Sequence, residues 1–144
     1  MRIYYIFNIK KDKYDIYNKT PSVLFNIFEN IYYYKNKFNE KSADFIELID
    51  TFNKEKINEK IFIKMHNEMR YLKRNNEHII NNLYKDEISI MKVTNTHIII
   101  NCNKNYTEFF NIISLYSNKL FVCDFINQDY FFINSEITNK YILL

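Results

Sequence analysis

Hydrophobic residues gather in five short runs of the kind that form β-strands. Residues 2–9 are β-branched and aromatic with little polarity on either face, which is typical of a strand covered on both sides. The later runs pair into two predicted hairpins, one turning at Thr94-Asn95, with Asn in place of Gly, and one around Asn127-Gln128. The five runs are residues 2–9, 87–93, 96–102, 120–125 and 130–133.

Three other segments carry apolar residues at helical spacing. The first begins at Thr20-Pro21, with Thr as N-cap and Pro in the first helical position. The second begins at Ser42 and extends to about Asn53, and the third begins at a capping box, Asn105 to Glu108, and ends near Asn118. Their predicted inward positions are Val23, Leu24, Ile27, Phe28 and Ile31; Phe45, Ile46, Leu48, Ile49 and Phe52; and Phe109, Phe110, Ile113 and Tyr116.

The middle of the chain has a weaker pattern. Residues 54–60 are charged and predicted to be a loop, and residues 61–69 alternate as a strand would, although a helix also fits them. Residues 75–85 are predicted to be a short helix with Ile79, Ile80 and Leu83 inward.

This order of elements predicts an α+β fold, with helices packed on a mixed or mostly antiparallel sheet. No repeat or low-complexity linker interrupts the 144 residues, so residues 1–144 are expected to form a single small domain.

Composition changes the picture mainly by exclusion. The chain has no Gly, and P-loops, dinucleotide-binding turns and nucleophile elbows all need Gly where a Cβ would clash. Asn is therefore expected at the positive-φ positions that Gly normally fills. The richness in Ile, Asn and Lys, with Ala43 the only Ala, indicates a low-GC bacterial genome.

Charge and targeting signals are weak. The net charge of +3 gives little support to nucleic-acid binding. No apolar run approaches the roughly 20 residues of a membrane span, and no signal peptide precedes the first strand. We therefore expect a cytoplasmic protein without membrane contact, in which Cys102 and Cys123 are buried free thiols.

Each candidate catalytic or metal-binding motif in the sequence is incomplete. His66-Asn67-Glu68 matches half of a zinc deaminase signature, but the required Pro-Cys pair is missing because the only Pro is Pro21. The three His and two Cys have no ligand-pair spacing, and His97 is interpreted as a solvated strand residue. Asp124 and Asp129 are two carboxylates near one hairpin, without a nucleophile. We expect no metal, no cofactor, no small-molecule substrate and no enzymatic activity.

Two binding functions remain open. Arg70, Lys73 and Arg74, with Tyr71 nearby, would share a face if helical, as in a weakly basic nucleic-acid-binding protein. Tyr14, Ile16 and Tyr17 interrupt a charged segment, residues 10–19, to which no helix or strand pattern is assigned. They either fold back onto the core or form an exposed anchor for another protein, as in a small adaptor domain.

The sequence resembles the sporulation inhibitor of replication (SirA) family of low-GC Gram-positive bacteria. The resemblance covers nearly the whole chain, and its carboxy-terminal block is the most specific part. The motifs that carry it are Tyr4-Tyr5-Ile6 to Ile9-Lys10, Ser22-Val23-Leu24-Phe25 with Ile27-Phe28, Met65-His66, Leu120 to Phe125, and Tyr130 to Asn134.

The resemblance implies a non-enzymatic protein that binds domain I of the replication initiator DnaA and blocks initiation in cells entering sporulation, without direct nucleic-acid contact. In the family, aromatic residues after the first strand and a polar residue near the start of a following helix contact the initiator. Tyr17 matches one aromatic position directly. The other falls on Lys13, with Tyr14 one step away, and the polar position falls near Asp44.

Overall fold

The computed structural model describes residues 1–34 and 38–133. Asn134, the last residue of the carboxy-terminal motif, lies outside them. The described helices are α1 (Lys11–Tyr17), α2 (Pro21–Tyr34), α3 (Ala43–Ile46), α4 (Lys54–Met65) and α5 (Glu108–Ile113). The described strands are β1 (Arg2–Ile9), β2 (Ile49–Asp50), β3 (Tyr71–Arg74), β4 (Glu77–Asn82), β5 (Glu87–Val93), β6 (Ile98–Cys102), β7 (Leu120–Asp124) and β8 (Asp129–Phe132).

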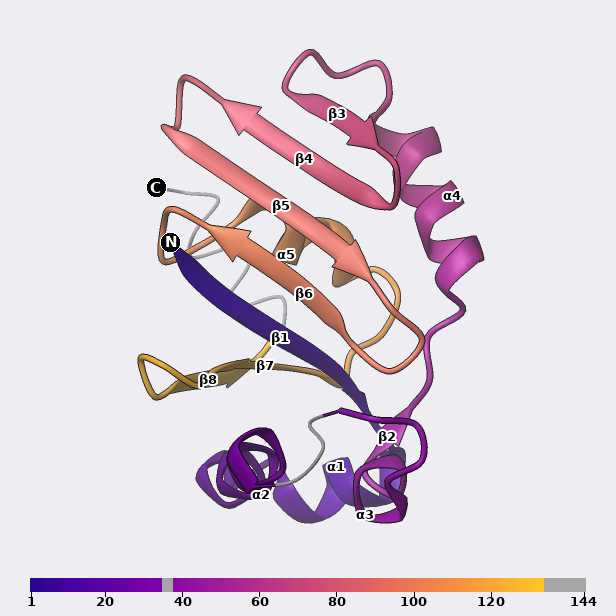
Figure 1. Cartoon of the computed structure of the whole chain (residues 1–144), viewed down its shortest axis with the longest axis vertical. Helices are drawn as coiled ribbons and strands as arrows, with labels where there is room; N and C mark the ends of the chain where they lie inside the picture. The colour runs from indigo at the N-terminus through magenta and orange to yellow at the C-terminus, as the bar shows by residue number, and fades with distance from the viewer. Residues whose placement is uncertain (35–37, 134–144) are drawn as a thin grey trace.

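One antiparallel sheet organises the molecule and confirms the predicted α+β class. Its strand order is β3-β4-β5-β6-β1-β7-β8, so the amino-terminal strand lies inside the sheet (Figure 1). Residues 2–6 of β1 pair with β6 and residues 5–8 pair with β7. The short β2 pairs with Asn8 and Ile9, which continues the β6 side of β1 beyond the end of β6.

The alternation of side chains along β1 divides the interior into two cores. Tyr4 and Ile6 face one side, where they pack with α4 and α5. Phe7 and Ile9 face the other side, beneath α2 and α3. The second core is rich in aromatic rings; the Phe7 and Phe28 rings, for example, stack with centroids 4.2 Å apart. The central strand is therefore covered on both sides, as its apolar sequence predicts.

Helices α1, α2 and α3 cover only part of their side of the sheet. In Figure 1 they lie together beyond β1, β7 and β8, and no described helix lies in front of β3 to β6. Helix α5 lies behind β5 and β6, on the opposite side. No helix in the described part of the chain is long and apolar enough to cross a membrane.

The five predicted strand runs form strands, while the middle of the chain departs from the prediction. Residues 54–60, expected as a loop, form the first half of α4, and the Asn53 side chain caps this helix by accepting from the Lys56 amide at 3.2 Å. Residues 61–65 complete α4, so of the two alternatives for residues 61–69 the helix is the one that forms there. Residues 77–82, expected in a helix, form β4, since His78 and Ile80 face the core at strand spacing. Leu83, expected inward, is 85% exposed.

Two predicted helices are shorter than expected. Helix α3 begins after Ser42 as predicted but ends at Ile46, because Ile49 leaves the helix to pair with Ile9 of β1. The cap of α5 is Thr107, whose hydroxyl accepts from the Phe109 amide at 3.2 Å, so the capping box at Asn105 is wrong and the helix ends at Ile113.

The turns partly follow the expectation that Asn replaces Gly. Asn75, Asp86 and Gln128 have φ near +50°, the left-handed region that usually favours Gly. The turn at Thr94-Asn95 is different: Asn95 is not among the positive-φ residues, and the turn closes through the Thr94 amide and the His97 carbonyl at 2.9 Å.

Candidate protein-binding surface

Helix α1 occupies the charged segment to which no element was assigned from the sequence. An Asp in its first turn complements the positive end of the helix, and Lys11 and Asp15 lie one turn apart with 3.9 Å between Nζ and Oδ2. The helix contains no fully buried residue. It is thus a surface helix that meets the protein only through partly buried side chains.

The two tyrosines of α1 lie on the side that meets the protein. Tyr14 and Tyr17 are half-buried against the aromatic core, and the Tyr14 ring meets the Phe132 ring edge-on, 5.1 Å between centroids. Ile16, between them in sequence, points away and is 60% exposed. The sequence left open whether these three residues fold back or stay exposed. In the structure the two tyrosines fold back onto the core and Ile16 stays exposed.

Helix α1 is fastened to the segment that carries α3. The Lys10 amide donates to the Leu48 carbonyl at 3.0 Å, just before the helix begins. The Lys13 ammonium lies 3.6 Å from the Glu47 carboxylate. Exposed ion pairs of this kind contribute little stability, so the main-chain bond is the firmer restraint.

Asp44 lies in the first turn of α3 and is exposed. Glu47, the partner of Lys13, follows it by three residues, about one helical turn. The fold therefore brings together the helices that carry the four predicted contact residues, Lys13, Tyr14 and Tyr17 on α1 and Asp44 on α3 (Figure 1).

One exposed apolar residue of α2 was assigned to the interior from the sequence. Val23 falls on the predicted inward stripe, but it is 46% exposed, one turn into the helix that follows α1. Leu24, Phe25, Phe28 and Ile31 form the buried face instead. Helical periodicity locates the stripe but not its edges, which is why Val23 was misplaced.

The other candidate residues are held in structural roles. Burial raises the pKa of both the Cys102 and the Cys123 thiol, which opposes thiolate formation. His66 is exposed at the end of α4, with Nδ1 3.1 Å from the Phe62 carbonyl oxygen. His97 is not solvated as predicted: its ring lies 5.4 Å from that of Phe38, and burial lowers its pKa to about 4.

Several of the charged candidates form ion pairs within the protein. The Arg2 guanidinium donates to Asp124 at 2.9 Å and to Asp129 at 3.0 Å, so both carboxylates of the hairpin are ion-paired. Arg70 donates to Glu108, with Nη2 2.6 Å from Oε2. Lys73 is in strand β3, so the predicted basic helical face does not form. No cluster of three potential metal ligands exists in residues 1–34 and 38–133.

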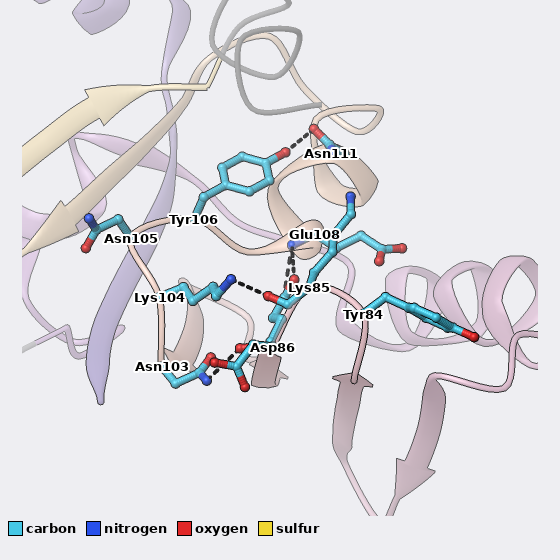
Figure 2. A pocket seen from close by; sticks show the side chains of 10 residues that line it. Tyr84, Lys85, Asp86, Asn103, Lys104, Asn105, Tyr106, Glu108 and Asn111 are labelled. Atoms are coloured by element: carbon cyan, nitrogen blue, oxygen red, sulfur yellow. Dashed lines mark hydrogen bonds between the residues drawn. The ribbon is translucent and has the colours of Figure 1, made fainter. Parts of the chain in front are cut away.

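A hollow of about 730 Å³ lies between the β4–β5 turn and the loop before α5 (Figure 2). Its polar groups fasten the two loops together: Asn103 Nδ2 donates to the Asp86 carbonyl at 2.9 Å, and Lys104 Nζ donates to the Lys85 carbonyl. Below them the buried Glu87 carboxylate accepts from the Thr107 hydroxyl at 2.8 Å and from the Glu108 amide. These contacts account for the loop conformations without a catalytic arrangement.

Comparison with known proteins identifies one family. No curated protein sequence matches the chain. The family model for the sporulation inhibitor of replication protein SirA matches residues 2–136, which include every described helix and strand. That family comprises regulatory inhibitors of replication rather than enzymes. Because the match covers nearly the whole length, the chain belongs to the SirA family.

Proposed function

We propose that this protein inhibits the initiation of chromosome replication in the cytoplasm of sporulating cells by binding domain I of DnaA. The proposal gives Tyr14, Tyr17, Lys13 and Asp44 the contacts with the initiator. It rests on membership of a family of sporulation inhibitors of replication, and on one structural observation: α1 is a helix without a buried residue that is nevertheless held in place.

The physical case is that α1 is organised before it binds. Its first turn is restrained through the Lys10–Leu48 bond and its last through the Thr20 amide, which donates to the Tyr17 carbonyl at 3.0 Å. Binding therefore costs little backbone entropy. Half-buried tyrosines have few rotamers left to lose, and tyrosine is among the commonest hot-spot residues at protein interfaces.

The surroundings of the tyrosines suit the rim of an interface. Lys10, Lys11, Asp12, Lys13 and Asp15 place charges of both signs around them. Such a polar rim around an aromatic centre is the usual anatomy of a specific contact between proteins. The proposed partner surface is accordingly an apolar groove with charged edges.

Nucleic-acid binding receives less support. Two carboxylates pair with Arg70, since Glu68 Oε2 is 2.8 Å from Nη1 and Glu108 Oε2 is 2.6 Å from Nη2. Arg74 lies 3.9 Å from Glu77. Arg70 and Arg74, two of the three basic residues of the cluster, thus already have acidic partners, which reduces the charge available to neutralise phosphates.

Calorimetry with domain I of DnaA from the same host tests the proposal. We expect one-to-one binding, and Tyr17→Ala should weaken it by about 2 kcal/mol, or about 30-fold, if Tyr17 is a hot spot. The matched control is Tyr84→Ala, at a fully exposed ring on the β4–β5 turn, which should leave the affinity unchanged.

Stability must be measured beside affinity, because Tyr17 packs partly on the core. Tyr17→Ala is expected to cost about 1 kcal/mol of folding stability while leaving the protein folded. Tyr17→Phe keeps the ring packing and should retain most of the affinity. Absence of binding by the folded wild-type protein at high concentration would refute the proposal, as would equal losses in the Tyr17 and Tyr84 variants.

A further inference from the structure

One face of strands β3 to β6 carries aliphatic side chains that belong to neither core. We call this set the aliphatic sheet face. Leu72 is 58% exposed and Ile88 is 45% exposed. Among the described residues no helix covers this face, since α1 to α3 lie beyond it and α5 lies behind the sheet (Figure 1). Helix α4 packs on the opposite face, with Ile57, Ile61 and Met65 in the core that contains Ile80 and Met91. Its members are Leu72, Ile79, Ile88, Ile90 and Ile99.

Strand register makes the face continuous. Leu72 lies opposite Ile79, and Ile79 lies opposite Ile90, so three adjacent strands contribute one aliphatic row. Neighbouring strands are about 4.8 Å apart, which places these side chains in contact distance across the sheet. A contiguous apolar patch, unlike scattered single residues, marks an interaction surface.

The row beside it carries charges of both signs. Arg74, Glu77 and Lys92 lie opposite one another on β3, β4 and β5 and point to the same face as the aliphatic row. Arg74 Nη2 lies 3.9 Å from Glu77 Oε1, and the two side chains are 64% and 41% exposed. Lys92 makes no ion pair in the part of the chain that the structure describes.

We propose that the aliphatic sheet face binds the same face of a second copy of this chain. A two-fold axis parallel to the strands, between β4 and β5, would lay β4 of each copy over β5 of the other. Ile79 then meets Ile90 of the second copy, and Glu77 meets Lys92 of the second copy. Because a two-fold interface is isologous, each contact occurs twice, and the two signs of charge complement each other.

The small size of the face indicates a weak association. Four strands and three rows of side chains give roughly 19 Å by 20 Å, or about 400 Å² per copy. A standard stable interface buries about 800 Å² per partner. The dimer is therefore weak and reversible, with a dissociation constant on the order of 0.1 to 1 mM.

Sedimentation velocity on the full chain, from about 10 µM to 1 mM, tests the inference. The wild-type protein should sediment as a monomer at the low concentration and shift toward a dimer at the high one. Ile90→Lys should remain monomeric throughout. Ile63→Lys is the matched control, since Ile63 is 61% exposed on α4, and it should self-associate like the wild type.

Charge reversal tests the proposed axis independently of the apolar contact. Glu77→Lys and Lys92→Glu should each weaken the dimer about tenfold, because each places like charges together. The double variant restores opposite signs at unchanged net charge and should recover wild-type association. Thermal melting of each variant verifies that it is folded.

A monomeric wild-type protein at 1 mM would overturn the inference. So would self-association that Ile90→Lys does not change, or a double charge variant no better than the single ones. None of these results bears on the binding of DnaA through α1, which lies on a different part of the molecule.

Discussion

Mild acid should destabilise this protein, because His78 is buried as a neutral ring. The side chain is fully buried, with Nε2 2.8 Å from the Asn58 Oδ1 and Nδ1 2.7 Å from the Tyr71 hydroxyl. The amide oxygen can only accept, so Nε2 carries the proton, and Nδ1 accepts from the tyrosine. Protonation of Nδ1 would disrupt this arrangement.

The magnitude follows from the pKa. Burial, with a smaller contribution from Lys73, lowers the pKa of His78 from 6.5 to about 4. Between pH 6.5 and pH 4 the unfolded chain therefore binds a proton at His78, whereas the folded protein does not. Stability contributed by the neutral ring is complete above pH 6.5 and is lost as the pH falls toward 4. The loss is about 2 kcal/mol at pH 5 and about 3 kcal/mol below pH 4.

Urea denaturation from pH 7.5 to 4 measures the effect. His97, whose pKa is also lowered to about 4, adds a similar loss of stability. Near pH 5 the slope of the wild-type free energy of unfolding against pH should therefore correspond to nearly two protons more on the unfolded chain than on the folded protein. His78→Gln should be less stable at pH 7.5. Its unfolding free energy should depend less steeply on pH, by the amount that corresponds to one bound proton. His66→Gln, at an exposed ring, controls for the substitution.

An unchanged slope in His78→Gln would refute the reasoning, since it would mean that His78 protonates equally in the folded and unfolded states. Because the slope and not the absolute stability is compared, a general loss of stability in the variant does not obscure the result.

Two further predictions concern buried polar groups. Asp124→Ala should lower the free energy of unfolding at neutral pH by about 2 to 3 kcal/mol, because the buried carboxylate accepts from Arg2 at 2.9 Å and from the Asn127 amide at 3.1 Å. Urea denaturation measures this loss, and a loss below about 0.5 kcal/mol would contradict the role. Cys102 and Cys123 should react with a thiol reagent only as fast as the protein opens, so labelling should accelerate with urea in step with unfolding, and fast labelling in the native state would show that the thiols are accessible.

The sequence predicted the fold best where pattern and burial agree. Strand β1 is apolar on both faces because two layers of helices cover it, and that shows directly in the sequence. The first half of helix α4 was assigned to a loop and its second half was left open between strand and helix, although its signals are present: Asn53 as cap, then Ile57, Ile61 and Met65 one turn apart. Its surface charges concealed that stripe, since three apolar residues in twelve give a weak period.

The candidate site shows the same division. The sequence located the segment of Tyr14 and Tyr17 by its aromatic residues, and the family resemblance extended it to Lys13 and Asp44. Neither indicated that the segment is a helix or that Tyr14 rests on Phe132, because a seven-residue helix far from its partner in sequence has almost no local signal.

By itself, the sequence determined the fold class, the family and the absence of Gly-dependent machinery, because these depend on local pattern and on residue type. Only the tertiary structure decided which apolar residues stay uncovered. Ile79 and Ile80 are adjacent and chemically identical, yet one faces the core and the other joins the aliphatic sheet face. The difference arises because successive side chains of a strand point to opposite faces, and which face receives a helix is decided by residues far away in the chain.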